Sequence, residues 1–127
     1  MKKIKIKSKK SLKAVGGYAQ ALEISDYERM LFISGQIPVN VDDSVPKDFR
    51  SQCEIVWQHI DAQLEEANMT SENIVKVTTF LSDRKYADEN SIIRQKYLRE
   101  NNPALTVIIT GIYDENWLVE IEAIAAA

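Results

Sequence analysis

The sequence of 127 residues contains one cysteine, Cys53, and one histidine, His59. One cysteine excludes an intramolecular disulfide, and together with a single histidine it excludes the Cys/His ligand sets that hold structural zinc. The four glycines form neither G-x-G-x-x-G nor a phosphate-binding loop, and no serine lies in G-x-S-x-G. The sequence therefore lacks the common signatures of nucleotide binding and nucleophilic serine chemistry.

Cys53 and His59 have structural interpretations. Cys53 lies on the apolar stripe of an expected helix, where burial raises a thiol pKa, so we expect a core residue rather than a nucleophile. His59 lies one position from that stripe and is expected to be an exposed or interfacial helix residue. The adjacent acidic pairs at 42–43 and 114–115 fall in expected turns, where acidic residues are common. We therefore expect neither a metal nor a cofactor.

Long hydrophobic runs are also absent. No segment approaches the roughly eighteen apolar residues of a membrane helix, and Met1–Lys5 has a basic flank without the apolar stretch of a signal peptide. A cytoplasmic location without membrane association is expected. The net charge of −3 argues against a nucleic-acid partner. The N-terminal lysines could form a basic arm, but their alternation with Ile4 and Ile6 favours a protected edge strand.

What the chain does contain is enough apolar sequence, 45% of residues, for the core of one domain over residues 1–127. The segments 18–24 and 29–35 read as strands joined by a hairpin through residues 25–28. A helix follows, with Ser44 as its cap and Pro46 in its first turn. Its apolar positions recur at steps of three or four: Phe49, Cys53, Val56, Ile60, Leu64 and Ala67.

The second half of the chain predicts a strand over 74–81 and another helix that ends before Pro103. One stripe of that helix contains Tyr86, Asn90, Ile93 and Tyr97. Two final strands, 107–112 and 118–124, are joined by a polar turn at 113–116. The order predicts an α+β fold, an α/β sandwich: a mixed, mostly antiparallel sheet with two helices on one face and hairpins at both ends. The other face would be apolar and is expected to be covered by oligomerisation.

Five short segments, in order along the chain, carry a family resemblance. They are Gly16-Gly17-Tyr18-Ala19-Gln20-Ala21, Ser34-Gly35-Gln36-Ile37-Pro38, Asn90, Asn102-Pro103-Ala104, and Val119-Glu120-Ile121-Glu122-Ala123-Ile124-Ala125. Together they resemble the reactive intermediate deaminase family, also called RidA or YjgF. The resemblance implies a chorismate-mutase-like subunit, a trimeric barrel, and clefts between subunits that hydrolyse imines or enamines.

The resemblance also assigns site residues. It implies that Tyr18, Ser34, Gly35, Asn90, Leu105 and Val107 line the cleft and that Glu120 directs a water molecule. Leu105 occupies the position of the family's carboxylate-binding arginine. A leucine offers no hydrogen bond and desolvates an anion, so ordinary 2-imino acid deaminase activity is expected to be weak or absent. A replacement cation could come from Arg84, Arg94 or a neighbouring subunit.

Three functions follow as hypotheses. The first is a homotrimer that binds and hydrolyses a small imine, enamine or carbonyl-derived metabolite, with Glu120 directing water. The second is a ligand-binding or regulatory trimer without catalysis, in which Leu105 shapes an apolar pocket. The third is the ribonuclease or translation-inhibitor role attached to some relatives, which the acidic charge disfavours.

Overall fold

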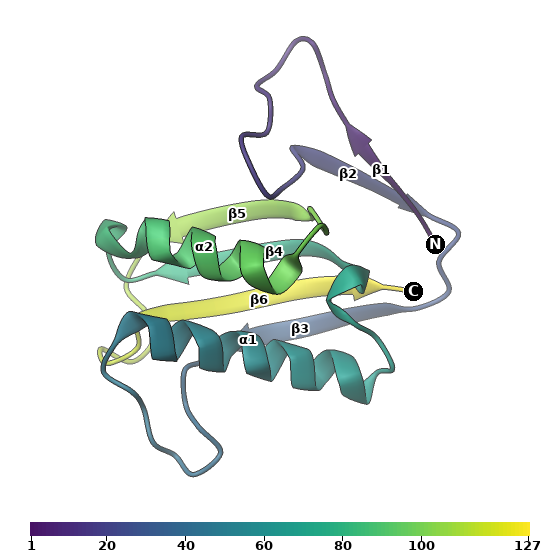
Figure 1. Ribbon diagram of the computed structural model, residues 1–127. Helices are drawn as coiled ribbons and strands as arrows, with labels where there is room; N and C mark the ends of the chain where they lie inside the picture. The colour runs from purple at the N-terminus through teal and green to yellow at the C-terminus, as the bar shows by residue number, and fades with distance from the viewer.

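The computed structural model describes residues 1–127, and its body is one sheet with both helices on the same face (Figure 1). The sheet order is β3-β6-β4-β5, formed by β3 (Met30–Gln36), β6 (Val119–Ala126), β4 (Ile74–Leu81) and β5 (Ala104–Ile109). Only β4 and β5 are parallel, whereas β6 is antiparallel to both of its neighbours. The predicted mixed, mostly antiparallel sheet with helices on one face is confirmed.

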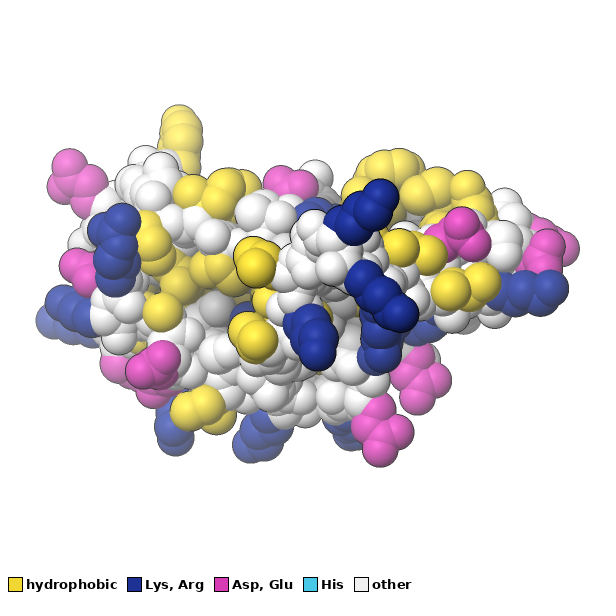
Figure 2. Space-filling view, turned by 90° about the horizontal axis from the view of Figure 1, so that it is seen from above, with side chains coloured by type: hydrophobic (Ala, Val, Ile, Leu, Met, Phe, Trp, Pro, Cys, Tyr) yellow, Lys and Arg dark blue, Asp and Glu magenta, His cyan; other side chains and the backbone are white.

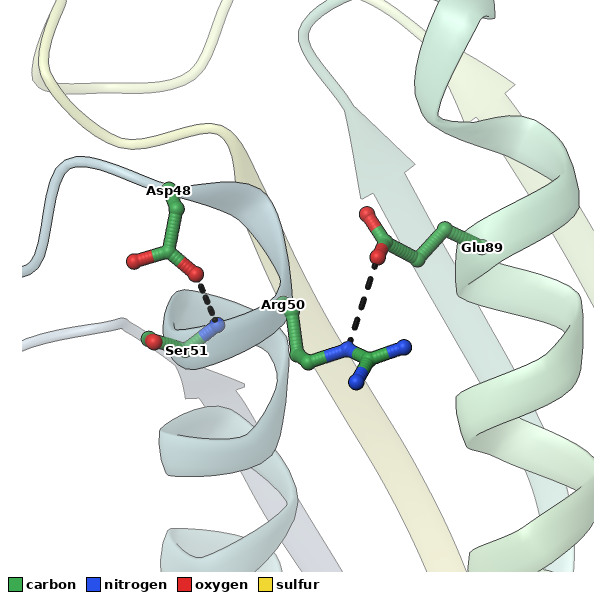
Figure 3. A network of polar contacts seen from close by, with 4 residues as sticks. All are labelled: Asp48, Arg50, Ser51 and Glu89. Carbon is green, nitrogen blue, oxygen red and sulfur yellow. Dashed lines mark hydrogen bonds and ion pairs between the residues drawn. The ribbon is translucent and has the colours of Figure 1, made fainter.

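Helix α1 (Phe49–Glu66) forms because its apolar residues follow the helical period and pack on the sheet. Its buried side chains are Phe49, Gln52, Cys53, Ile55, Val56, Trp57, Ile60 and Leu64. The predicted start is wrong, because Asp48 caps the helix and Ser44 and Pro46 lie in the preceding loop. The Asp48 carboxylate accepts a hydrogen bond from the Ser51 backbone N–H at 2.9 Å (Figure 3).

Helix α2 (Ala87–Leu98) begins after a short 3-10 turn, η2 (Arg84–Tyr86). Its buried residues are Asn90, Arg94 and Leu98, which recur every four positions and therefore share one face. The predicted stripe found Asn90, but it did not include Arg94. Neither α1 nor α2 combines the length and apolar character that crossing a membrane requires.

The predicted N-terminal hairpin is wrong. β2 (Ala21–Ser25) pairs with β1 (Lys2–Ile6), and the two form a ribbon that extends away from the body (Figure 1). The chain turns at Asp26, whose φ is 54°, and the backbone N–H groups of Glu28 and Arg29 both donate to the Ala127 carbonyl, at 2.8 and 2.9 Å. The chain entering β3 is thus held by the C-terminus, not by β2.

The ribbon leaves apolar residues exposed beside its lysines. Ile4 and Ile6 are 50% and 44% exposed. In the view from above, hydrophobic side chains lie next to Lys and Arg side chains over this part of the surface (Figure 2). One contact between the ribbon and the body runs through Lys3, whose Nζ donates to the Glu72 carbonyl at 2.7 Å and to the Asn101 side chain at 2.9 Å.

The predicted C-terminal hairpin is also wrong, since β4 separates β5 from β6. The connecting loop crosses the end of β4, where the Thr110 N–H donates to the Leu81 carbonyl at 2.9 Å and the Ser82 N–H donates to the Leu118 carbonyl at 3.0 Å. A polar turn sequence fits a hairpin and a crossover equally well. β5 also begins three residues earlier than predicted, directly after Pro103.

Candidate functional site

The seven predicted site residues fall into two groups on opposite faces of the sheet. Alternation along each strand assigns the faces, because successive side chains point in opposite directions. On β6 the residues that face the helices are Val119, Ile121, Ala123 and Ala125, all buried. Glu120 and Glu122 therefore point to the face that no helix covers, which we call the open face.

The open-face group consists of Ser34, Gly35 and Glu120. The pairing of β3 with β6 shifts register between Ile33 and Gln36, so the chain bulges at Ser34 and Gly35. A Cβ built on Gly35 would overlap Oε2 of Glu120, which shows that the half-buried glutamate side chain lies directly against this glycine. Any other residue at position 35 would displace the carboxylate.

The second group lies on the helix side of the sheet, around α2 and β5. Asn90 of α2 is 1% exposed. Leu105 is in register with Val77, a fully buried core residue, and packs against the core cluster from the same side. Val107 is in register with Thr79 and is 39% exposed. Leu105 therefore forms part of an apolar wall with no charged group of its own.

Tyr18 belongs to the helix-side group. The next residue, Ala19, donates its N–H to the Pro103 carbonyl at 3.0 Å and bridges to Ala104, so this loop runs beside the start of β5. Gly17 has a φ of 65°, and a Cβ there would lie 2.8 Å from Cγ of Gln95 on α2. Glycine at this position permits both the backbone conformation and the close approach that hold Tyr18 beside α2.

One chain does not bring the two groups together, because the sheet itself lies between them. Glu120, Ser34 and Gly35 lie on the open-face side, and Tyr18, Asn90, Leu105 and Val107 lie on the helix side. A single pocket lined by both groups would need a second copy of the chain. Two surface hollows of about 330 and 470 Å³ lie along the segment 98–102 and contain none of these residues.

The two nominated replacement cations differ in position. Arg84 is exposed in η2, whereas Arg94 is 4% exposed on α2, one helical turn after Asn90. Burial lowers the pKa of the Arg94 guanidinium. No group of three or more His, Cys, Asp or Glu side chains is placed to hold a metal ion.

Sequence comparison identifies the family. A family model described as Endoribonuclease L-PSP matches residues 8–127, nearly the whole chain. The chain belongs to this family, which includes the RutC and Rid proteins. Among its Rid-family relatives, a RutC family protein of Aquifex aeolicus is 36% identical over 123 residues, covering 94% of this chain and 96% of the relative. A RutC family protein of Pyrococcus abyssi is 32% identical and covers 98% of both chains.

Solved Rid structures share the fold. YyfB of Yersinia pestis, from the conserved Rid protein family, superposes with a TM-score of 0.86 over the full length of both chains at 21% identity. YyfA of the same organism is 32% identical, with a TM-score of 0.74 over 99% of this chain and 100% of the other. The Rid-family assignment made from five short segments is thereby confirmed.

Proposed function

We propose that the chain forms a homotrimer whose inter-subunit clefts bind a small imine, enamine or carbonyl-derived metabolite. The observation that carries this proposal is the separation of Glu120 from the Asn90 and Leu105 group by the sheet. In the proposed assembly, the open face of one subunit meets the α2 and β5 edge of its neighbour. Each cleft then contains one half-site from each of two chains. Escherichia coli TdcF, a structural neighbour at 25% identity, has been solved with bound serine, a ligand of the size proposed.

Glu120 is the proposed water-directing group. Its half-buried carboxylate lies against Gly35 and forms no ion pair or hydrogen bond within the chain, so it is free to accept a proton from water. Water adds to the carbon of the C=N bond, the nitrogen takes up protons, and the C–N bond breaks to give a carbonyl and ammonia. This is hydrolysis at a C–N bond and requires no cofactor.

Leu105 limits which substrates this cleft can hold. A 2-imino acid carries its carboxylate on the reacting carbon, and Leu105 presents a partly buried hydrocarbon wall in place of a bidentate donor. The missing charge-assisted contact is worth about 1.5 to 3 kcal/mol, or roughly ten- to a hundred-fold in binding. Ordinary 2-imino acid deamination is therefore expected to be weak.

The test compares ammonia release from a freshly generated 2-imino acid by four proteins. They are the natural protein, Leu105→Arg, Glu120→Ala and the double variant with both changes. We expect low activity from the natural protein, a gain of about tenfold or more in Leu105→Arg, and loss of that gain when Glu120→Ala is added. Fast deamination by the natural protein that Glu120→Ala abolishes would contradict the negative role of Leu105. Activity of Leu105→Arg that survives Glu120→Ala would contradict the role of Glu120.

The apolar wall at Leu105 and Val107 also supports a second candidate, a ligand-binding trimer without turnover. Binding that Glu120→Gln leaves unchanged, with no ammonia released from any imine tested, would favour it. The ribonuclease role has less support, because the chain carries a net charge of −3. Salt-sensitive cleavage of RNA would revive it. A cytoplasmic location also remains a proposal, since one relative, yeast protein MMF1, is mitochondrial.

A further inference from the structure

Arg94 is a buried cation without an anionic partner. It is 4% exposed, and the only hydrogen bond of its guanidinium runs from Nη2 to the Ser91 hydroxyl at 3.0 Å. Its Nε is buried and has no partner. The two ion pairs in the structure, Lys2–Asp26 and Arg50–Glu89, lie elsewhere. By contrast, buried Gln52 is satisfied by three hydrogen bonds.

The unsatisfied donor lies in the helix-side half of the site. Asn90, one turn earlier on the same face of α2, is 1% exposed, and its Oδ1 also has no partner. Gly17, the residue before Tyr18, lies against Gln95, the residue after Arg94 on α2. The loop that carries Tyr18 therefore lies beside the segment of α2 that carries Arg94.

A buried charge without a counter-ion is costly, and arginine does not escape this cost by losing its proton at neutral pH. An anion bound beside it would offset that cost. We propose that Arg94 is the anion anchor of the cleft and that the ligand is a small carboxylate whose acid group accepts from the Arg94 guanidinium on α2. Arg94 thereby takes the role that Leu105 cannot perform.

This proposal rests on the proposed function, because it places the ligand in the same cleft, and it narrows the ligand class. An anchor on α2 holds the acid group at a different point from an arginine on β5. The carboxylate of a 2-imino acid is joined directly to the reacting carbon and cannot shift independently of it. A carbonyl compound with its acid group several bonds away has the freedom to reach both Arg94 and the water at Glu120.

The probe pair is 4-oxopentanoate and its uncharged methyl ester, which differ in the charge at one end. Calorimetry would measure the binding of each to the natural protein, Arg94→Gln and Arg84→Gln. The last variant removes the same charge at an exposed position and is the matched control. We expect the natural protein and Arg84→Gln to prefer the acid by about ten- to a hundred-fold, and Arg94→Gln to lose this preference.

Equal binding of acid and ester by the natural protein, or an undiminished preference in Arg94→Gln, would overturn the proposal. Alternatively, Arg94 could pair with a carboxylate of a neighbouring copy of the chain. Arg94→Gln would then change the mass of the assembly and leave the preference for the acid unchanged, and this result would also overturn the proposal. If Arg94→Gln does not fold, Arg94→Lys decides: a weakened preference supports the anchor, and an unchanged one contradicts it.

The calorimetric experiment measures binding without turnover. The anion-anchor proposal and the proposed catalytic function can therefore fail separately. Acid binding that depends on Arg94, with no Glu120-dependent ammonia release, would leave the anchor standing and remove the catalytic function. Ammonia release that depends on Glu120, together with a preference for the acid that does not depend on Arg94, would support the catalytic function and remove the anchor.

Discussion

Cys53 has no exposed surface, and burial raises the pKa of its thiol to about 12. The thiol is therefore neutral at physiological pH, and its position in the core cluster confirms the prediction of a packed residue. Above the ordinary value of 9.0, the unfolded chain releases this proton while the folded chain keeps it until about pH 12. The contribution of Cys53 to stability is thus present below pH 9 and declines as the pH rises above it.

A maleimide tests the burial of Cys53. At neutral pH we expect the native protein to react about a thousandfold or more slowly than the same chain in denaturant, because reaction waits for unfolding. The measurement is the rate of the mass increase, with the urea-unfolded chain as the control. Native labelling at the rate of the unfolded chain would show that the thiol is accessible.

At the scale of elements, α1 carries much of the core and its start depends on a single side chain. Asp48 accepts the Ser51 N–H, and this hydrogen bond lowers the pKa of the Asp48 carboxyl. A carboxyl with a lowered folded-state pKa stabilises the fold above its unfolded pKa, and the contribution is lost as the pH falls through the folded value. The nearby Arg50–Glu89 contact, 3.6 Å long and exposed, adds little (Figure 3).

We expect Asp48→Ala to lower the Tm at neutral pH by more than Asp48→Asn, since asparagine retains a capping oxygen. The difference between the natural protein and Asp48→Ala should narrow as the pH falls through the titration of the Asp48 carboxyl. Thermal unfolding followed by circular dichroism at neutral and acidic pH measures both effects. Identical Tm values for Ala and Asn variants would mean that the cap does not stabilise α1.

At the scale of the whole molecule, the open face lacks a cover. Phe32 is 70% exposed there, and Met30 and Ile108, which point the same way, are 42% and 41% exposed. Apolar groups that share one face are typical of a surface buried by a partner. In the proposed trimer, a second copy would cover these side chains and bring Asn90 toward Glu120.

Light scattering after size exclusion tests the assembly. We expect a mass three times the 14.5 kDa of one chain for the natural protein and a mass near one chain for Phe32→Glu. Val41→Glu is the control, because Val41 is 97% exposed in a loop. A natural protein with the mass of one chain, or a Phe32→Glu variant that keeps three chains, would contradict the proposed assembly.

Features set by local sequence were predicted correctly, whereas strand pairings between distant segments were not. The α1 stripe, the strand over 74–81 and the family follow from periodicity and short segments, and all are confirmed. Both hairpins fail, because strand partners are set by distant contacts such as those of Ala127 with Glu28 and Arg29. The sequence names Arg94 as a candidate cation but does not predict its burial, since arginine is rarely buried.

The placement of Glu120 and Asn90 on opposite faces of one sheet has a genetic consequence. In the proposed assembly, no cleft takes both residues from the same chain. A substitution of Glu120 in one chain and a substitution of Asn90 in another can therefore fall in different clefts. When the two chains are co-expressed, mixed trimers contain clefts with both residues intact. Two alleles that are each inactive alone would then restore one another, whereas two alleles defective in the same half would not.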